Sequence, residues 1–404
     1  MGQENGVKRA EMAQLLAELS NAPGVSGFED EVVAVLRREM DGLGAMTEDK
    51  MRNLYLERKE NCDVGGEKRL TVMLDAHTDE VGFIVQGINA NGMLRILPIG
   101  DWDTRNVPAQ RVLVRAMVAE SGAITESGSA DDSGAIAEGG VVTEGGSSIS
   151  TFARTYAYVP GITTSKPPHY LTDDEQRQVL GFDTILVDVG ANSCEEVRAL
   201  GIDIGAPIVP DVTFAYDAAR DIAVGKAFDC RSGCAALVTT LRELAGEALD
   251  VNVVAAFSTQ EEVGLRGAKV TAERVRPDVA IVFEGTPADD NFRDAYTSQT
   301  RLGYGPMLRH MDRSMITHPR FQRWALDVAQ RQGLPHQVAV REGGGTNAGA
   351  IYLSSMGVPV IVLGVPARYI HTPNSMSRLD DHLATVELAK ILLRELNNEV
   401  FALL

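Results

Sequence analysis

The sequence predicts an α/β protein in which a mixed, mostly parallel β-sheet is flanked by helices and carries a small inserted β-rich domain. Three observations lead to this fold class. Short apolar runs alternate with segments of helical periodicity, which is typical of a sheet with helices on both faces. Residues 81–177 interrupt this alternation. Acidic and histidine side chains follow the apolar runs, as ligand-binding residues do at the carboxyl ends of parallel strands.

Several segments have the apolar spacing of helices. In the first, apolar residues recur at helical spacing from Ala10 to Leu19, and the sequence Ala22-Pro23-Gly24 ends the pattern. A second helix is expected from Glu29 onward. Further helices are expected over residues 233–245, 321–331 and 385–399.

Short apolar runs predict the strands of the sheet, over residues 70–76, 184–189, 251–257, 279–283 and 358–363. His77 follows the first of these runs, and the pair Glu261 and Glu262 comes shortly after the third. Glu284 follows the fourth, and His371 lies in the loop after the last. Because ligands bind beyond the carboxyl ends of strands in such sheets, we expect these side chains to form the functional site.

The β-rich insert is expected over residues 81–177, between two parts of the α/β domain at residues 1–80 and 178–404. The insert contains short β-like runs separated by turn residues. Within it, residues 119–150 are low in complexity, and neither Lys nor Arg occurs between Arg115 and Arg154. This composition predicts a solvated loop or hairpin, with a gate or contact arm as the alternative.

Composition excludes several classes of protein. The chain has 404 residues, with 38 Lys and Arg against 56 Asp and Glu, and a formal net charge of −18. That charge argues against binding nucleic acid or an anionic membrane through a general positive field. No run approaches the roughly 20 apolar residues of a spanning helix, and the first residues lack the apolar core of a signal peptide. The four cysteines are scattered, so a reducing cytoplasm is expected.

The polar residues after the strands supply the donor set of a metal centre. Each has a plainer explanation alone: a structural strand-end histidine for His77, surface charges for the paired glutamates, and a helix N-cap for Asp229. Together, two imidazoles and several carboxylates suit two divalent ions of the zinc or cobalt type. One carboxylate shared by two ions about 3.5–4 Å apart is the usual arrangement for hydrolysis. One of the paired glutamates would remain to carry the proton.

Segments along almost the whole chain carry a resemblance to a known family: APGVSGFEDEV, LDAHTDEVGFIV, GDWDTRNVPAQRV, GITTSKPPHYLT, DVGANSCEEVRALGI, GKAFDCRSGCAAL, STQEEVGLRGA, GGGTNAGAI and ARYIHTPNSMSRLDD. With these segments the chain resembles the M42 family of metallo-aminopeptidases, the group of glutamyl and tetrahedral (TET) aminopeptidases. The resemblance implies a zinc-peptidase type of sheet. It also implies that the insert mediates dimer formation and that six dimers build a tetrahedral dodecamer.

The resemblance implies a role for each metal ligand. His77 and Glu284 would bind one divalent ion, and Glu262 and His371 would bind a second. Asp229 would bridge the two ions. The metal would be zinc or cobalt, with manganese as the alternative.

Two further residues receive roles from the resemblance. Glu261 would be the general base and acid, and Asp79 would orient His77. The implied activity is removal of the first residue from peptides with a free amino terminus, with no nucleic-acid or membrane partner. The alternatives are a related metallohydrolase, such as a deacylase or amidohydrolase, and a catalytically inactive assembly homologue.

The chain departs from the family pattern at several positions. Cys230 replaces the usual Asp or Asn after Asp229, and a thiol is a poor hydrogen-bonding substitute but a soft metal ligand. Glu284 stands where Asp is frequent and still offers oxygen donors. Asn347 stands where Asp is common, which removes one negative charge near the site. Residues 119–150 are additional to a typical member.

Overall fold

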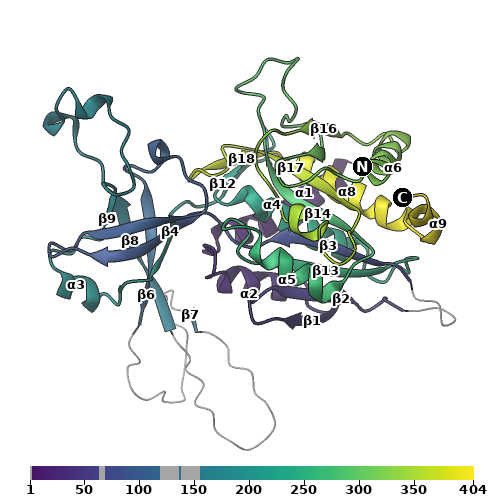
Figure 1. The fold of residues 1–404 in the computed structure, drawn as a ribbon, viewed down its shortest axis with the longest axis horizontal. Coiled ribbons are helices and arrows are strands. Elements are labelled where there is room, and N and C mark those ends of the chain that lie inside the picture. The colour runs from purple at the N-terminus through teal and green to yellow at the C-terminus, as the bar shows by residue number, and fades with distance from the viewer. Residues whose placement is uncertain (1, 63–68, 119–135, 138–154) are drawn as a thin grey trace, which may run out of the picture. The chain divides into compact units, whose positions relative to one another are not determined.

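The computed structural model describes residues 2–62, 69–118, 136–137 and 155–404. The chain forms two compact units, which Figure 1 shows with their elements labelled. The first, called the α/β unit here, comprises Met1–Val81 and Val212–Leu404. The second, called the barrel unit, comprises Gly82–Asp211.

An eleven-stranded mixed sheet forms the centre of the α/β unit. Its four middle strands are parallel neighbours in the order β13, β3, β14, β17, while the strands outside them pair antiparallel, except that β15 and β16 are parallel. This confirms the predicted fold class. The strands are, in sheet order, β1 (Gly44–Glu48), β2 (Leu54–Arg58), β13 (Asn252–Ser258), β3 (Thr71–His77), β14 (Val279–Pro287), β17 (Val360–Arg368), β18 (Ser375–Ser377), β12 (Ile222–Gly225) and β11 (Ala215–Asp217), with β15 (Met307–Met311) and β16 (Gln337–Val340) beside β17.

Side chains alternate between the two faces of the middle strands, and both faces are covered. In β3, Val72 and Leu74 belong to one hydrophobic core and Met73 to the other, as the two-residue period of a strand requires. Helices α1, α2, α4, α6 and α8 contribute to the first core, and α5 and α7 to the second. Burial on both faces explains why these strands are nearly continuous apolar runs.

The expected helices are present with shifted ends, and α5, α7 and α9 are additional to them. Their bounds are α1 (Gly2–Asn21), α2 (Asp30–Glu39), α4 (Phe228–Glu243), α5 (Arg266–Val275), α6 (Pro319–Arg331), α7 (Ala348–Ile351), α8 (Leu379–Glu395) and α9 (Asn398–Ala402). Helix α4 packs against β3, β14 and β17 and is itself covered by α1 and α8.

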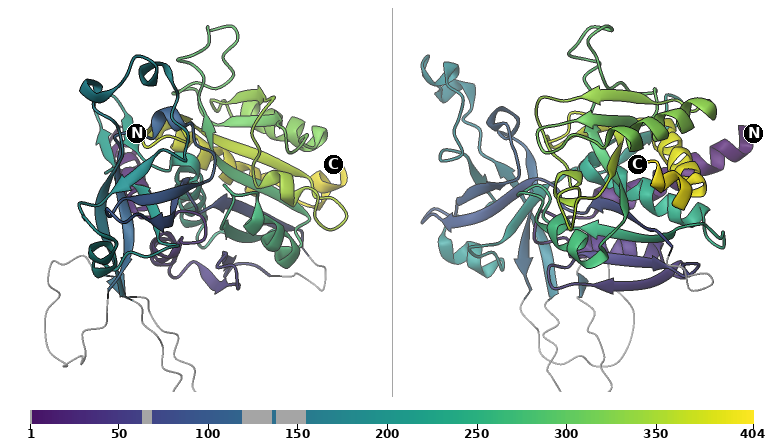
Figure 2. Two further views of the ribbon diagram at one scale, coloured as in Figure 1. Left: turned by 60° about the vertical axis from the view of Figure 1, so that its left-hand side comes forward. Right: turned by 45° about the vertical axis from the view of Figure 1, so that its right-hand side comes forward.

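The barrel unit is a closed sheet (Figure 2). Its strands follow the order β6 (Arg111–Met117), β10 (Pro207–Pro210), β4 (Gly82–Ile88), β5 (Leu94–Ile99), β9 (Leu186–Asp188), β8 (Thr155–Thr163) and β7 (Ile136–Ala137). Because β6 also pairs with β8, six of these strands form a ring. Short helices lie at Thr104–Asn106, Pro168–Tyr170, Glu175–Arg177 and Cys194–Ala199, the last being α3.

The insert ends at Asp211, not at residue 177 as expected. The apolar run at residues 184–189, expected in the α/β sheet, instead forms β9, which pairs with β5 and β8 of the barrel. Strand β10 likewise pairs with β4 and β6. A run of this length indicates a strand without indicating which sheet it joins. The expected loop or gate at residues 119–150 lies outside the described residues apart from β7, and stays a prediction.

Among the described residues, no helix is both long enough and apolar enough to cross a membrane. The four cysteines are all free thiols, and Cys230 and Cys234 are buried.

Candidate metal centre

The carboxyl ends of the four parallel strands bring most of the predicted site residues together. His77 is the last residue of β3, and Glu284 lies near the carboxyl end of β14. Glu261 and Glu262 lie in the loop that follows β13, and His371 lies in the turn that follows β17. The expectation that one edge of the sheet gathers these side chains is therefore met in the geometry.

The carboxylate of Asp229 lies between the two imidazoles. Its Oδ1 is 3.0 Å from His77 Nε2, and its Oδ2 is 3.3 Å from His371 Nε2. Each imidazole also faces a glutamate, at 3.4 Å between His77 Nε2 and Glu284 Oε1 and at 3.4 Å between His371 Nε2 and Glu262 Oε2. The arrangement consists of two groups of donors that share one carboxylate.

Asp229 reaches this position from the beginning of α4. The backbone of Asp229 and of Cys230 is not helical there, and the peptide bond between them is cis. The residue at the helix N-cap is Ala227, and no side chain caps the helix. The plainer explanation of Asp229 as an N-cap is therefore wrong.

Asp79 links the end of β3, which carries His77, to the loop after β13, which carries Glu261 and Glu262. Its Oδ1 and Oδ2 accept hydrogen bonds from the backbone N–H groups of Glu261 at 2.9 Å and Glu262 at 3.1 Å. His77 Nδ1 lies 3.3 Å from Asp79 Oδ1 and 3.2 Å from its backbone oxygen. Ser26 Oγ donates a further hydrogen bond to Asp79 at 2.6 Å. One buried carboxylate thus holds the paired glutamates and the His77 ring together.

Ser26 and Glu29 are residues that the sequence analysis did not single out. Glu29 accepts hydrogen bonds from the backbone N–H groups of Gly27 at 2.8 Å and Gln260 at 3.1 Å. Burial raises the pKa of Glu29 to about 8, and the neighbouring Asp79 adds to the effect. The only signal was their place in the segment APGVSGFEDEV, which shows no strand-end pattern.

Burial and mutual repulsion dominate the electrostatics of the glutamates. Burial raises the pKa of Glu261 and of Glu284, and it raises the pKa of Glu262 to about 8. Neighbouring carboxylates raise each of these pKa values further, whereas the imidazoles lower them. Burial also raises the pKa of Asp229, but hydrogen bonds with His371 and His77 outweigh it and bring this pKa below its usual range. Buried acidic groups in such a cluster need a cation to be ionised together.

A second network lies beneath His77, within the sheet. Asp75 is completely buried in β3 and accepts hydrogen bonds from Asn347 Nδ2 at 2.7 Å and from the Ser258 hydroxyl. Burial raises the pKa of Asp75 to about 7. The amide of Asn347 thus donates to a carboxylate whose other hydrogen-bond donor here is the Ser258 hydroxyl. A carboxylate at this position would face Asp75 without a proton to donate.

Comparison with known proteins identifies the family. The sequence model of the M42 glutamyl aminopeptidases matches residues 61–127 and 141–388. The chain belongs to the M42 peptidase family. The resemblance, the fold class and the enzyme class predicted from sequence are thereby confirmed, and membership of this metallopeptidase family implies a divalent metal.

Relatives match this M42 peptidase over nearly its full length. The glutamyl aminopeptidase of Lactococcus lactis is 30% identical over 394 residues, 97% of this chain and 98% of the relative. The TET aminopeptidase of Thaumarchaeota archaeon SCGC AB-539-E09 has a TM-score of 0.82 and 32% identity, covering 97% of this chain and 99% of that chain. The Pyrococcus horikoshii TET1 peptidase, which can assemble into a tetrahedron or a large octahedral shell, has a TM-score of 0.76 and 26% identity, covering 95% and 100%.

The residues present in this M42 peptidase fit a divalent cation. Ligand atoms of His77, Asp229 and Glu262 lie within 4.8 Å of one another, and so do those of His77, Cys230 and Glu284. Nitrogen and carboxylate oxygen are donors that zinc binds. The individual roles expected for these residues stay predictions.

The substitution Asn347→Asp should destabilise the protein by about 3 kcal/mol, because it sets a second buried carboxylate against Asp75 and removes the donor. Chemical denaturation in the presence of a chelator measures this effect without a contribution from bound metal. The matched exchange, Asp75→Asn combined with Asn347→Asp, restores a carboxylate–amide pair and should recover most of the loss. An exchange variant no more stable than Asn347→Asp alone would show that the two side chains are not coupled.

Proposed function

We propose that this M42 peptidase removes N-terminal residues from peptides at a centre of two divalent ions, with Glu261 as the general base. One observation carries the proposal: the Asp229 carboxylate lies between two imidazoles, each of which faces its own glutamate. A shared carboxylate between two donor groups is what a pair of hydrolytic ions requires. The ions would be zinc or cobalt, with manganese as the alternative.

The two groups of donors divide between the ions. His77 and Glu284 would hold one ion, His371 and Glu262 would hold the other, and Asp229 would contribute one oxygen to each. Ions bound there supply a Lewis acid that polarises the scissile carbonyl and lowers the pKa of water.

Glu261 is placed to move a proton during hydrolysis. Its Oε2 lies 4.0 Å from His77 Nε2, outside the two donor groups but beside them. Burial raises its pKa above that of an ordinary glutamate, which suits a group that first accepts and then returns a proton near neutral pH. Glu261 would take the proton of the attacking water and deliver it to the leaving amine. Asp79 would keep this carboxylate in place through the backbone N–H of Glu261.

A carboxylate that binds neither ion also suits the substrate's amino terminus. Glu261 would remain outside both donor groups, so its charge would attract a protonated α-amine nearby. An N-blocked peptide lacks that charge. We therefore propose that only peptides with a free amino terminus are cleaved.

The four free thiols agree with a reducing, cytoplasmic location.

Self-association is the second part of the proposal. The TET1 neighbour assembles into closed shells, and this chain matches that neighbour over 95% of its length. We propose that the barrel unit mediates dimers and that these build a tetrahedral dodecamer.

Removal of metal should abolish peptide hydrolysis, because the donor groups cannot polarise a carbonyl without a cation. Activity on a panel of free-amine peptides is measured before chelation, after chelation, and after addition of zinc, cobalt or manganese. Restored release of the first residue from free-amine peptides, with N-acetylated versions left intact, is the expected result. Cleavage of blocked substrates would instead favour a deacylase or amidohydrolase, and no cleavage despite bound metal would favour an inactive homologue.

Glu261→Gln should lower turnover by about 10²–10⁴-fold, because the amide cannot accept the proton, while the metal content stays at the wild-type value. Elemental analysis and single-turnover assays measure the two quantities. Glu262→Gln is the matched control, since it changes the adjacent side chain and should lower metal content as well. Near-normal turnover of Glu261→Gln would remove this residue from its role.

The native protein should be a dodecamer in solution, and light scattering after size-exclusion chromatography gives its mass. A monomer at micromolar concentration would contradict the proposed assembly and leave the proposed chemistry unaffected.

A further inference from the structure

We infer that Cys230 binds the ion of His77 and Glu284 through its sulfur, so that one ion of this peptidase has a mixed nitrogen, oxygen and sulfur ligand set. The inference rests on the metal centre proposed above. It concerns the position at which this chain departs from the family's usual Asp or Asn.

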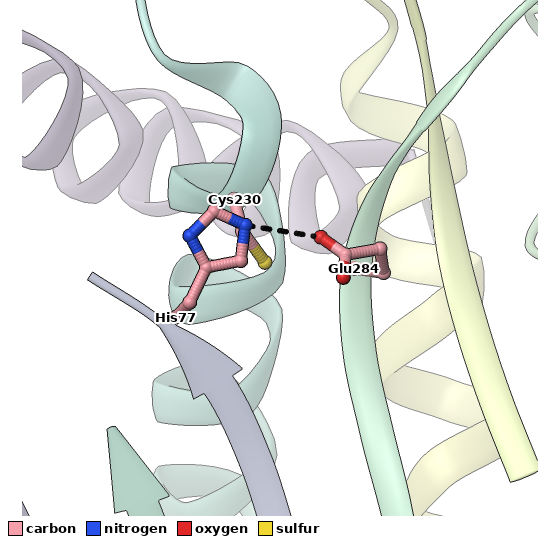
Figure 3. Close-up of side chains that lie close together, drawn as sticks. All are labelled: His77, Cys230 and Glu284. Atoms are coloured by element: carbon pink, nitrogen blue, oxygen red, sulfur yellow. Dashed lines mark ion pairs between the residues drawn. The ribbon is translucent and has the colours of Figure 1, made fainter. Parts of the chain in front are cut away.

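The three side chains converge from three different elements. Figure 3 shows His77 from β3, Cys230 from α4 and Glu284 from β14 beside one another. One ligand atom from each residue, including Sγ of Cys230, lies within 4.8 Å of the other two. His77, Cys230 and Glu284 are 1%, 0% and 3% exposed. Ligand atoms of one tetrahedral zinc ion lie about 3.3–3.8 Å apart when the bonds are about 2.0–2.3 Å long, so atoms within 4.8 Å of one another are close enough to share an ion after small shifts.

Packing holds the sulfur at this place. The Cys230 thiol donates a hydrogen bond to the backbone oxygen of Phe283 at 3.2 Å, directly before Glu284 in β14. Gly233 borders both the sulfur and the Phe283 oxygen, since a Cβ there would be 2.4 Å from Sγ and 2.8 Å from that oxygen. A glycine is therefore required where α4 meets β14, because any side chain at position 233 would overlap the sulfur and the Phe283 carbonyl.

A sulfur ligand would make the two ions unequal. The first ion would have four protein donors, from His77, Cys230, Glu284 and Asp229, which is the closed coordination of a structural zinc site. The second would have three, from Asp229, Glu262 and His371, which leaves a position open as in catalytic sites. A thiolate also favours zinc and other soft ions over manganese and magnesium. Binding displaces the thiol proton to solvent, so the sulfur bonds to the ion as a thiolate.

Cys234 is a natural control for Cys230. It lies one turn further along α4, is equally buried, and donates its own hydrogen bond, to the backbone oxygen of His77 at 3.1 Å. It belongs to neither group of donors. Cys234 therefore offers a second buried thiol near the centre that has the same chemistry as Cys230 and is not expected to bind metal.

Cobalt absorption spectra test the inference. Apoprotein loaded with stoichiometric Co²⁺ should show visible d–d bands, which report bound cobalt, and a near-ultraviolet sulfur-to-cobalt charge-transfer band, which reports the thiolate. Cys230→Ser should lose the charge-transfer band and keep the d–d bands, whereas Cys234→Ser should keep both. Cys230→Asp carries a residue that is usual in the family, and it should likewise lose the charge-transfer band and keep the d–d bands. This second variant keeps the test valid if Cys230→Ser fails to fold.

The outcomes separate this inference from the proposed function. Two results would overturn the role of Cys230 and leave the metal centre intact. One is a wild-type spectrum with d–d bands and no charge-transfer band. The other is a charge-transfer band that persists in Cys230→Ser or Cys230→Asp. Absence of the d–d bands of protein-bound cobalt would overturn the metal centre itself. X-ray absorption of the zinc-loaded wild type is independent of any variant: a Zn–S shell at about 2.3 Å supports the inference, and a spectrum without one overturns it.

Discussion

Repulsion among closely spaced carboxylates is the constraint on which the rest of the site depends. Asp229, Glu261, Glu262 and Glu284 lie in one small region with two imidazoles as their nearest positive partners. Like charges at such distances repel by several kcal/mol away from bulk water, so the fold must impose this arrangement against its own electrostatics. It does so with four parallel strands whose two buried faces hold their ends rigidly. Membership of a metallopeptidase family agrees with this need for a cation.

The rigidity extends beyond the strands into a layer of supporting side chains. Asp79 ties the loop after β13 to the end of β3, and Ser26 and Glu29 from the amino-terminal segment brace that junction. Asp75 and Asn347 do the same one layer deeper. Each of these residues acts on the site through another residue. The paired glutamates can therefore keep different orientations although they are adjacent in the chain, because their backbone N–H groups are bound separately.

The sequence predicted which side chains gather at one edge of the sheet better than it predicted the domain boundary, for physical reasons. A strand buried on both faces is an apolar run, and polar residues directly after it stand out, so the ends of β3, β13 and β14 were recognisable. Strand β9 has three residues and half-buried flanks, so nothing local reveals which sheet it joins. The contact of Asp75 with Asn347 joins residues 272 positions apart, and no local pattern encodes such a pairing. Cys230 departs from the family pattern in sequence alone, but its approach to His77 and Glu284 depends on how α4 packs against β14.

The closed barrel has a consequence for how the proposed metal ligands meet during folding. His77 precedes the insert, and the other ligands follow it, so the chain must cross Gly82–Asp211 before β3 can pair with β13. The first and last strands of the insert, β4 and β10, are themselves paired, with Ile208 opposite Phe83. The barrel therefore brings its own two ends together, and once it has formed, closing the loop resembles closing a short turn. That lowers the entropic cost of closure by roughly 3 kcal/mol relative to an open chain of the same length. A pairing that is distant in sequence becomes a nearly local event.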